Sequence, residues 1–206
     1  MNGYIIPNDG KIHTHFSELT RCTAGQMHSV LNERAGILKP YKSPSMDFGT
    51  KRHDEWRDES LKTGRSPKEF KAQPISFDVK ADLVERELAS EVLPNIVLHS
   101  RMDFYGEGNL IDFKTTTMDR RRAMQTYDKS IQLKIYAYQL MIHNYPVDKI
   151  TYLIEHWTRD YSKQLGYSKV EKDFLPRYIK EAQGWIKRRC LTLEQGLAIA
   201  KEDGIL

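Results

Sequence analysis

Residues 101–116 of the chain read RMDFYGEGNLIDFKTT, and this stretch predicts a β-hairpin. Apolar and polar side chains alternate on both sides of Gly106–Asn109, a segment with strong turn chemistry. A turn at this position pairs Phe104 with Ile111, so that apolar side chains face each other. The hairpin is therefore expected to have one apolar face and one polar face.

The polar face of this hairpin carries two opposed carboxylates. The same register places Asp103 directly opposite Asp112, and Lys114 points to the same face. Like charges directly opposite each other destabilise a sheet, so we expect a cation or a shared proton between them. Two carboxylates and an ammonium can hold Mg²⁺ or Mn²⁺ and position a water molecule. Taken alone, these residues leave open a second interpretation, a charged sheet surface that faces solvent.

Helical and strand periodicities alternate along the rest of the chain. This order predicts an α/β fold with a mixed central sheet flanked by helices. Without repeats or long linkers, we expect one domain, residues 1–206: a helical N-terminal part at 1–47, a motif core at about 48–157 and C-terminal helices at 171–206. The expected helices are 17–34, 47–61, 128–144, 174–189 and 193–201, and the expected strands are 82–88, 96–105, 110–115 and 150–157.

Composition bounds the class of protein. The 206 residues are 39% hydrophobic, which is enough for a core and excludes wholesale disorder. Membrane-length apolar segments and a secretory leader are lacking, and two cysteines make no disulfide framework, so we expect a cytoplasmic protein. The net charge of +4 permits a polyanionic partner. Basic residues cluster at 62–71, 120–122 and 187–189, and for each cluster alone a solvated surface is the simpler interpretation.

The hairpin pattern resembles a known family of enzymes. Asp103 followed by Asp112-Phe113-Lys114 is similar to the core of the PD-(D/E)XK nucleases, in which an acidic residue and (D/E)-x-K lie on adjacent strands. Three further motifs resemble the RecB-type exonuclease branch, and the hairpin sequence is also similar to phage recombination exonucleases. These motifs are Gln132-x-x-x-Tyr136, Phe48-Gly49-x-x-x-His53 and Ser17-x-Leu19-x-x-Cys22.

The resemblance implies a restriction-endonuclease-like fold and a role for each matching residue. Lys114 would orient or activate the attacking water and stabilise charge on the scissile phosphate. Gln132 and Tyr136 would line the site and contact the DNA or the lysine. The implied metal ligands are His53, Asp103, Asp112 and the backbone carbonyl of Phe113, with Glu85 or Glu87 as an additional acidic contact. The implied DNA-binding residues are Arg120, Arg121 and Arg122.

Two positions depart from the family pattern. Arg57 stands where the motif helix often has a glutamate, so a metal ligand is not expected there. Iron–sulfur relatives hold their cluster with one early and three late cysteines, whereas this chain has Cys22 and Cys190 alone. Because such clusters need four protein ligands, we expect no iron–sulfur cluster.

The resemblance implies a Mg²⁺- or Mn²⁺-dependent exonuclease that hydrolyses DNA from its ends and leaves 5′-phosphates. Two alternatives remain open: a restriction or structure-specific endonuclease on the same fold, and a non-catalytic DNA-binding module. The expected partners are DNA ends, single- or double-stranded, and recombination or single-strand-binding proteins in a bacterial or phage-infected cell. Recombination or repair of DNA is the expected setting. Strand polarity and oligomeric state are not specified by the sequence.

Overall fold

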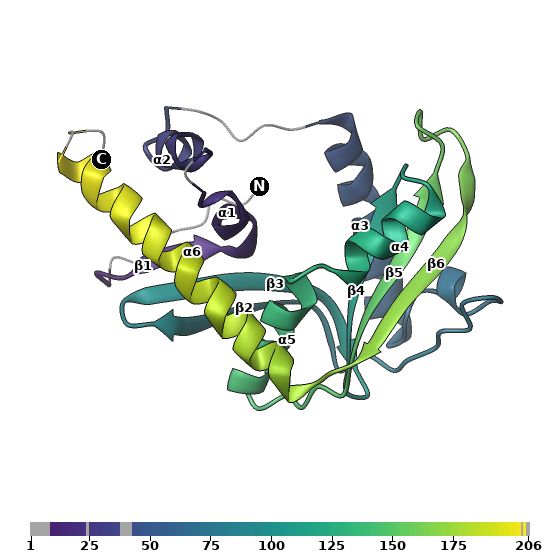
Figure 1. The fold of residues 1–206 in the computed structure, drawn as a ribbon. Helices are drawn as coiled ribbons and strands as arrows, with labels where there is room; N and C mark the ends of the chain where they lie inside the picture. The colour runs from purple at the N-terminus through teal and green to yellow at the C-terminus, as the bar shows by residue number, and fades with distance from the viewer. Residues whose placement is uncertain (1–8, 24, 38–42, 203, 205–206) are drawn as a thin grey trace. The chain divides into compact units, whose positions relative to one another are not determined.

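A computed structural model describes residues 9–23, 25–37, 43–202 and 204 of the chain (Figure 1). It shows an α/β fold with a mixed six-stranded sheet flanked by helices, as predicted. The hydrogen-bonded order is β1-β3-β4-β5-β6, and β2 also pairs with β3. The elements are β1 (Ile12–His15), α1 (Phe16–Arg21), α2 (Met27–Arg34), α3 (Pro44–Thr63), the 3₁₀ turn Lys68–Phe70, β2 (Leu83–Leu93), β3 (Ile96–Gly106), β4 (Asn109–Thr116), α4 (Arg120–Asp128), α5 (Gln132–Ile142), β5 (Lys149–Trp157), β6 (Gln164–Asp173) and α6 (Pro176–Glu202).

The contacts of the chain group into two compact units. The first unit comprises the described residues of 1–41, 88–100 and 180–206, and the second comprises those of 42–87 and 101–179. All residues predicted to form the site, except the first-helix motif, belong to the second unit.

The β3–β4 hairpin of the second unit has the predicted register. Phe104 pairs with Ile111 and Gly106 pairs with Asn109 in an antiparallel ladder. The turn residues Glu107 and Gly108 have φ angles of +50° and +73°, as a two-residue hairpin of the favoured hand requires. The positive φ of Gly108 favours glycine, and a Cβ atom there would lie 2.3 Å from an Asp148 carboxylate oxygen, so the Asp148 side chain would have to move for any other residue.

The sheet of the second unit has a dense aromatic core on one face. The fully buried Trp56 of α3 meets Phe113 of β4 with ring centroids 5.3 Å apart. The core cluster also contains Phe70, Ile75, Phe77, Phe104, Ile111 and Leu153. Since side chains alternate along β4, Asp112 and Lys114 project from the opposite face, where α5 contacts β4 and β5 (Figure 1).

Helix α3 has well-defined signals at both ends. The hydroxyl of Ser43 accepts a hydrogen bond from the backbone N–H of Met46, and Pro44 occupies the first helical turn. Gly64 ends the helix in the left-handed conformation at φ +64°. These signals give α3 a longer span than the predicted 47–61, and His53 lies within it.

The first unit packs helices against a short parallel strand pair. β1 pairs with residues 96–99 of β3, and a ring nitrogen of His13 lies 2.8 Å from one of His99. Arg189 of α6 donates a hydrogen bond of 2.8 Å to the backbone carbonyl of Cys22. Both cysteines are free and buried.

Several predicted element boundaries were wrong. The expected helix 17–34 is divided into α1 and α2 near Cys22, where the backbone leaves the helical region at ψ 72°. The two expected C-terminal helices form the single helix α6, because Ile186, Cys190 and Leu193 continue one buried stripe.

Other elements were missed. β1 spans four residues, which is too short for a visible alternation, and the edge strand β6 is mostly polar and has a single buried residue. Helix α4 begins within the arginine triplet, where few apolar residues mark a buried face. None of the helices in the described residues is long and apolar enough to cross a lipid bilayer.

Candidate metal and nuclease centre

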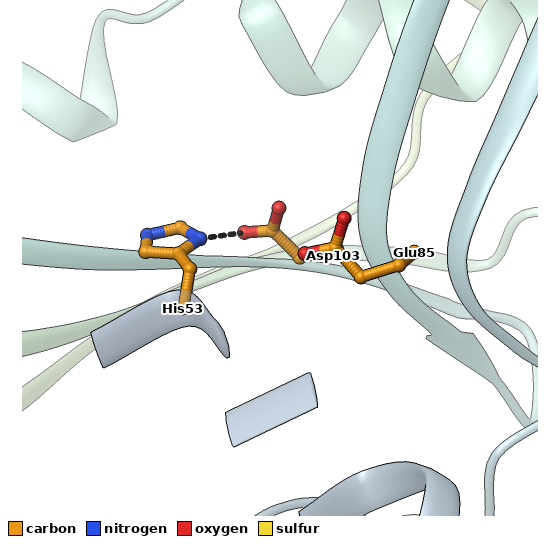
Figure 2. Close-up of side chains that lie close together, drawn as sticks. All are labelled: His53, Glu85 and Asp103. Atoms are coloured by element: carbon orange, nitrogen blue, oxygen red, sulfur yellow. Dashed lines mark ion pairs between the residues drawn. The ribbon is translucent and has the colours of Figure 1, made fainter. Parts of the chain in front are cut away.

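Three side chains from three elements converge in the second unit. His53 of α3, Glu85 of β2 and Asp103 of β3 point toward one another, and one ligand atom of each lies within 4.8 Å of the others (Figure 2). Nδ1 of His53 is 3.4 Å from Oδ2 of Asp103, which also accepts a hydrogen bond of 2.8 Å from the backbone N–H of Phe113. The three residues are partly buried, so their charges interact more strongly than on an open surface.

The charges of this cluster shift its pKa values in both directions. Burial opposes ionisation of Asp103, but the positive charges of His53 and Lys114 outweigh burial and hold the pKa of Asp103 below its usual value. Burial likewise opposes protonation of His53, and the charge of Asp103 outweighs it and raises the pKa of His53. Burial and the charge of Asp103 raise the pKa of Glu85. In the metal-free cluster, Asp103 is therefore easier to ionise, His53 is easier to protonate and Glu85 is harder to ionise than the free side chains.

Asp112 and Lys114 of β4 form a buried ion pair beside the cluster. Lys114 Nζ contacts Oδ2 of Asp112, whose side chain is 2% exposed. Burial and the charge of Asp103 raise the pKa of Asp112 to about 6, although Lys114 opposes the shift. Burial disfavours the charged form of Lys114. The negative charges of Asp112 and Asp103 outweigh burial and raise the pKa of Lys114 above its usual value. Lys114 is thus a cation at neutral pH and can donate hydrogen bonds but accept none.

Helix α5 contributes Gln132 and Tyr136 to the same place. The amide of Gln132 donates hydrogen bonds of 3.1 Å to Oδ1 of Asp112 and of 3.1 Å to the hydroxyl of Tyr136. The structure therefore places Gln132 against the carboxylate rather than against the lysine. Tyr136 is 7% exposed, so its hydroxyl is a fixed acceptor that helps to orient the Gln132 amide.

The basic clusters have different surroundings. Arg120, Arg121 and Arg122 are exposed on the first turn of α4, which follows β4 in the chain. In the 62–71 cluster, Arg65 and Lys71 both form ion pairs with Asp78, at 2.8 Å and 3.2 Å. In the 187–189 cluster, Arg189 lies over the ring of Trp185 within the first unit.

The side chains present fit a hard divalent cation. Carboxylate oxygens suit Mg²⁺ and Mn²⁺, and one imidazole is a common additional ligand for Mn²⁺. His53, Glu85 and Asp103 supply such donors already gathered around one point, and Asp112 lies next to them on β4. Arg57 forms ion pairs with Asp54 and Asp58 instead of joining this cluster.

Two features of the site were not resolved or not found from the sequence. The alternation of β2 left Glu85 and Glu87 equivalent, and the structure brings Glu85 to the cluster while Glu87 is exposed. Glu85 has φ +49°, a left-handed conformation that is uncommon for a non-glycine residue in a strand. The ion pair between Arg101 and Glu85 was missed, because no spacing rule links residues on two strands whose register is unknown.

Comparison with known proteins identifies solved structures that share this fold. No protein-family model and no curated protein sequence matches this chain. Among solved structures, an alkaline exonuclease from Laribacter hongkongensis superposes with a TM-score of 0.56 at 12% identity, covering 93% of this chain and 93% of that chain. The same exonuclease in complex with dAMP gives a TM-score of 0.54 at 12% identity, covering 95% and 94%.

A phage-related exonuclease from Haemophilus somnus gives a TM-score of 0.55 at 11% identity, covering 91% of this chain and 96% of that chain. The chain thus has the fold of these exonucleases over nearly its whole length. The fold expected from the PD-(D/E)XK resemblance is confirmed.

Proposed function

We propose that this protein is a Mg²⁺- or Mn²⁺-dependent deoxyribonuclease that degrades DNA from its ends. The observation that carries the proposal is the convergence of His53, Glu85 and Asp103 beside the Asp112–Lys114 ion pair. Donors for a hard cation and an ammonium at one point are the groups that phosphodiester hydrolysis requires. The shared fold with exonucleases supports the same assignment.

In the proposed mechanism, each residue has a defined task. His53, Glu85, Asp103 and Asp112 would hold the metal, together with the backbone carbonyl of Phe113. When bound, the metal lowers the pKa of a water molecule and offsets charge on the phosphate. Lys114 would orient the attacking water by donating a hydrogen bond and would stabilise the extra negative charge of the transition state. Gln132, supported by Tyr136, keeps Asp112 oriented, and α4 contacts the DNA backbone through Arg120, Arg121 and Arg122.

End-labelled and circular DNA test whether hydrolysis starts from DNA ends. Linear duplexes labelled separately at the 5′ or 3′ end, linear single strands and a covalently closed circle would be incubated with Mg²⁺, Mn²⁺ or EDTA. We expect the linear substrates to be degraded to products with 5′-phosphates and the circle to stay intact. Cleavage of the circle would instead identify an endonuclease, and binding without cleavage would identify a non-catalytic module.

The Lys114→Ala variant tests the mechanism. Loss of the ammonium removes a preorganised charge from the transition state, so we expect kcat to fall by about 100-fold or more. DNA affinity and the circular-dichroism spectrum are expected to stay near wild type. Lys129→Ala, which removes an exposed lysine after α4, is the control that should retain activity. Full activity in Lys114→Ala would rule out the proposed role of the lysine.

A further inference from the structure

Arg101 holds one carboxylate of the proposed metal cluster. It lies two residues before Asp103 on β3, and its Nε atom is 2.9 Å from Oε2 of Glu85. The Glu85 side chain is 14% exposed, whereas that of Arg101 is 69% exposed. The ion pair therefore joins a largely enclosed ligand to a guanidinium that is mostly in solvent.

A metal ion and Arg101 compete for Glu85. Metal binding needs the oxygen lone pairs of Glu85 and adds positive charge at the point where the guanidinium lies. Both effects weaken the Arg101–Glu85 ion pair. Because Arg101 is long and exposed, it can leave Glu85 by side-chain rotation without any change in β3.

We propose that Arg101 exchanges partners, pairing with Glu85 in the metal-free protein and with a phosphate of the bound DNA once Glu85 holds the metal. This inference rests on the proposed nuclease function. Residues 101 and 103 share a face of β3 and lie about 6.6 Å apart along the strand. Successive nucleotides of one DNA strand rise by about 3.4 Å. A DNA strand that passes Asp103 with phosphates at this spacing would bring one of them within reach of the released guanidinium.

The backbone at Glu85 is consistent with such an exchange. Glu85 adopts φ +49°, which turns its side chain toward His53 and Asp103 at a cost in local strain (Figure 2). In the metal-free protein, Arg101 neutralises the resulting contact between the Glu85 and Asp103 carboxylates. The arginine thus keeps the ligand in place until the metal arrives, and metal binding makes the arginine available to DNA.

Two binding measurements on Arg101→Ala test the exchange. In calorimetry without DNA, Mn²⁺ affinity should increase about threefold to fivefold, because Mn²⁺ no longer has to displace one partly exposed ion pair from Glu85. With Ca²⁺ in place of Mg²⁺ to hold the site without rapid turnover, affinity for linear DNA should fall several-fold, and the salt dependence should decrease by about one phosphate contact. In EDTA, DNA affinity should match that of wild type, because Arg101 then pairs with Glu85.

Controls separate this inference from its alternatives. Arg86→Ala removes an exposed arginine from β2 and should reproduce none of these changes. Arg101→Gln is the second variant, so a folding defect of the alanine variant leaves the test intact. Equal loss of DNA affinity in Ca²⁺ and EDTA, or Mn²⁺ affinity that is unchanged or weaker, would overturn the exchange. If the wild-type protein binds no Mn²⁺ and cleaves no DNA, the proposed nuclease function is rejected. If the wild-type protein is active and the variants give the contradicting results above, the partner exchange alone is rejected.

Discussion

Asp103 is the residue on which the charges of the site converge. It contacts an imidazole from α3 and a backbone N–H from β4, and Glu85 of β2 lies within ligand distance. Two carboxylates this close repel each other, and this repulsion adds to the effect of burial in raising the pKa of Glu85. A divalent cation between them removes the repulsion, which gives the cluster its expected affinity for metal.

The choice between Glu85 and Glu87 gives a prediction at the residue scale. Glu85→Gln removes a charged ligand from the cluster, whereas Glu87→Gln alters an exposed side chain on the same strand. We expect Glu85→Gln to weaken Mn²⁺ binding at least tenfold in calorimetry and Glu87→Gln to leave it unchanged. Equal affinities in the two variants would contradict the assignment of Glu85 as a ligand.

At the scale of elements, a buried ion pair attaches α3 to β5. Arg52 donates hydrogen bonds of 2.9 Å and 2.8 Å to the two carboxylate oxygens of Glu155, whose side chain is 1% exposed. The next residue in α3 is His53. The pair therefore sets the position from which the histidine reaches Asp103.

Breaking this pair is expected to destabilise the protein. Arg52→Met leaves the Glu155 carboxylate buried without its bidentate partner, and we expect the free energy of unfolding to fall by about 3 kcal/mol in urea titrations. Arg57→Met in the same helix removes the ion pairs with Asp54 and Asp58, which are more exposed, and should cost less than about 1 kcal/mol. Similar losses in both variants would show that the Arg52–Glu155 ion pair stabilises the fold no more than the exposed ion pairs of Arg57.

Helix α4 presents its arginines to solvent at the end that follows the β4 strand. If they contact phosphates, Arg120→Ala and Arg121→Ala should each weaken DNA binding and lower the slope of log Kd against log salt by about one. Binding isotherms between about 50 and 200 mM salt measure this slope. Arg177→Ala, at the exposed start of α6, is a control of the same charge; an unaltered slope in the α4 variants would exclude α4 as a phosphate-binding element.

At the scale of the whole molecule, the first unit encloses both thiols. Burial raises the pKa of Cys22 to about 11 and that of Cys190 to about 12. At pH 8 both thiols should react slowly with a disulfide reagent in the native protein and promptly after denaturation. Rapid reaction of the native protein would contradict the described packing of this unit.

The same thiols make stability depend on pH. A cysteine in the unfolded chain ionises near pH 8.5, whereas the buried thiols keep their protons to higher pH. The folded state then binds more protons, so these groups lower the free energy of unfolding as the pH rises above about 8.5. Cys22→Ala should show a smaller decrease in urea titrations between about pH 8 and 10.

The sequence by itself determined the hairpin and its register, because the alternation from Met102 to Lys114 and the turn at Glu107-Gly108 allow a single pairing of apolar faces. The resemblance of its motifs to a nuclease family implied that His53, Gln132 and Tyr136 lie near Asp103 and Asp112, and these side chains do contact one another in the structure. Short or polar elements such as β1, α4 and β6 carried too little periodicity to be recognised.

Only the tertiary structure decided which acidic residue of β2 joins the site and what holds it there. Glu85 and Glu87 share one face of an ideal strand, and the left-handed φ of Glu85 distinguishes them. The partner of Glu85 is Arg101 on the next strand, a contact that depends on register and backbone strain rather than on residue type. Local patterns encode hydrogen bonding and burial along one element, whereas the meeting of side chains from several elements is set when those elements pack.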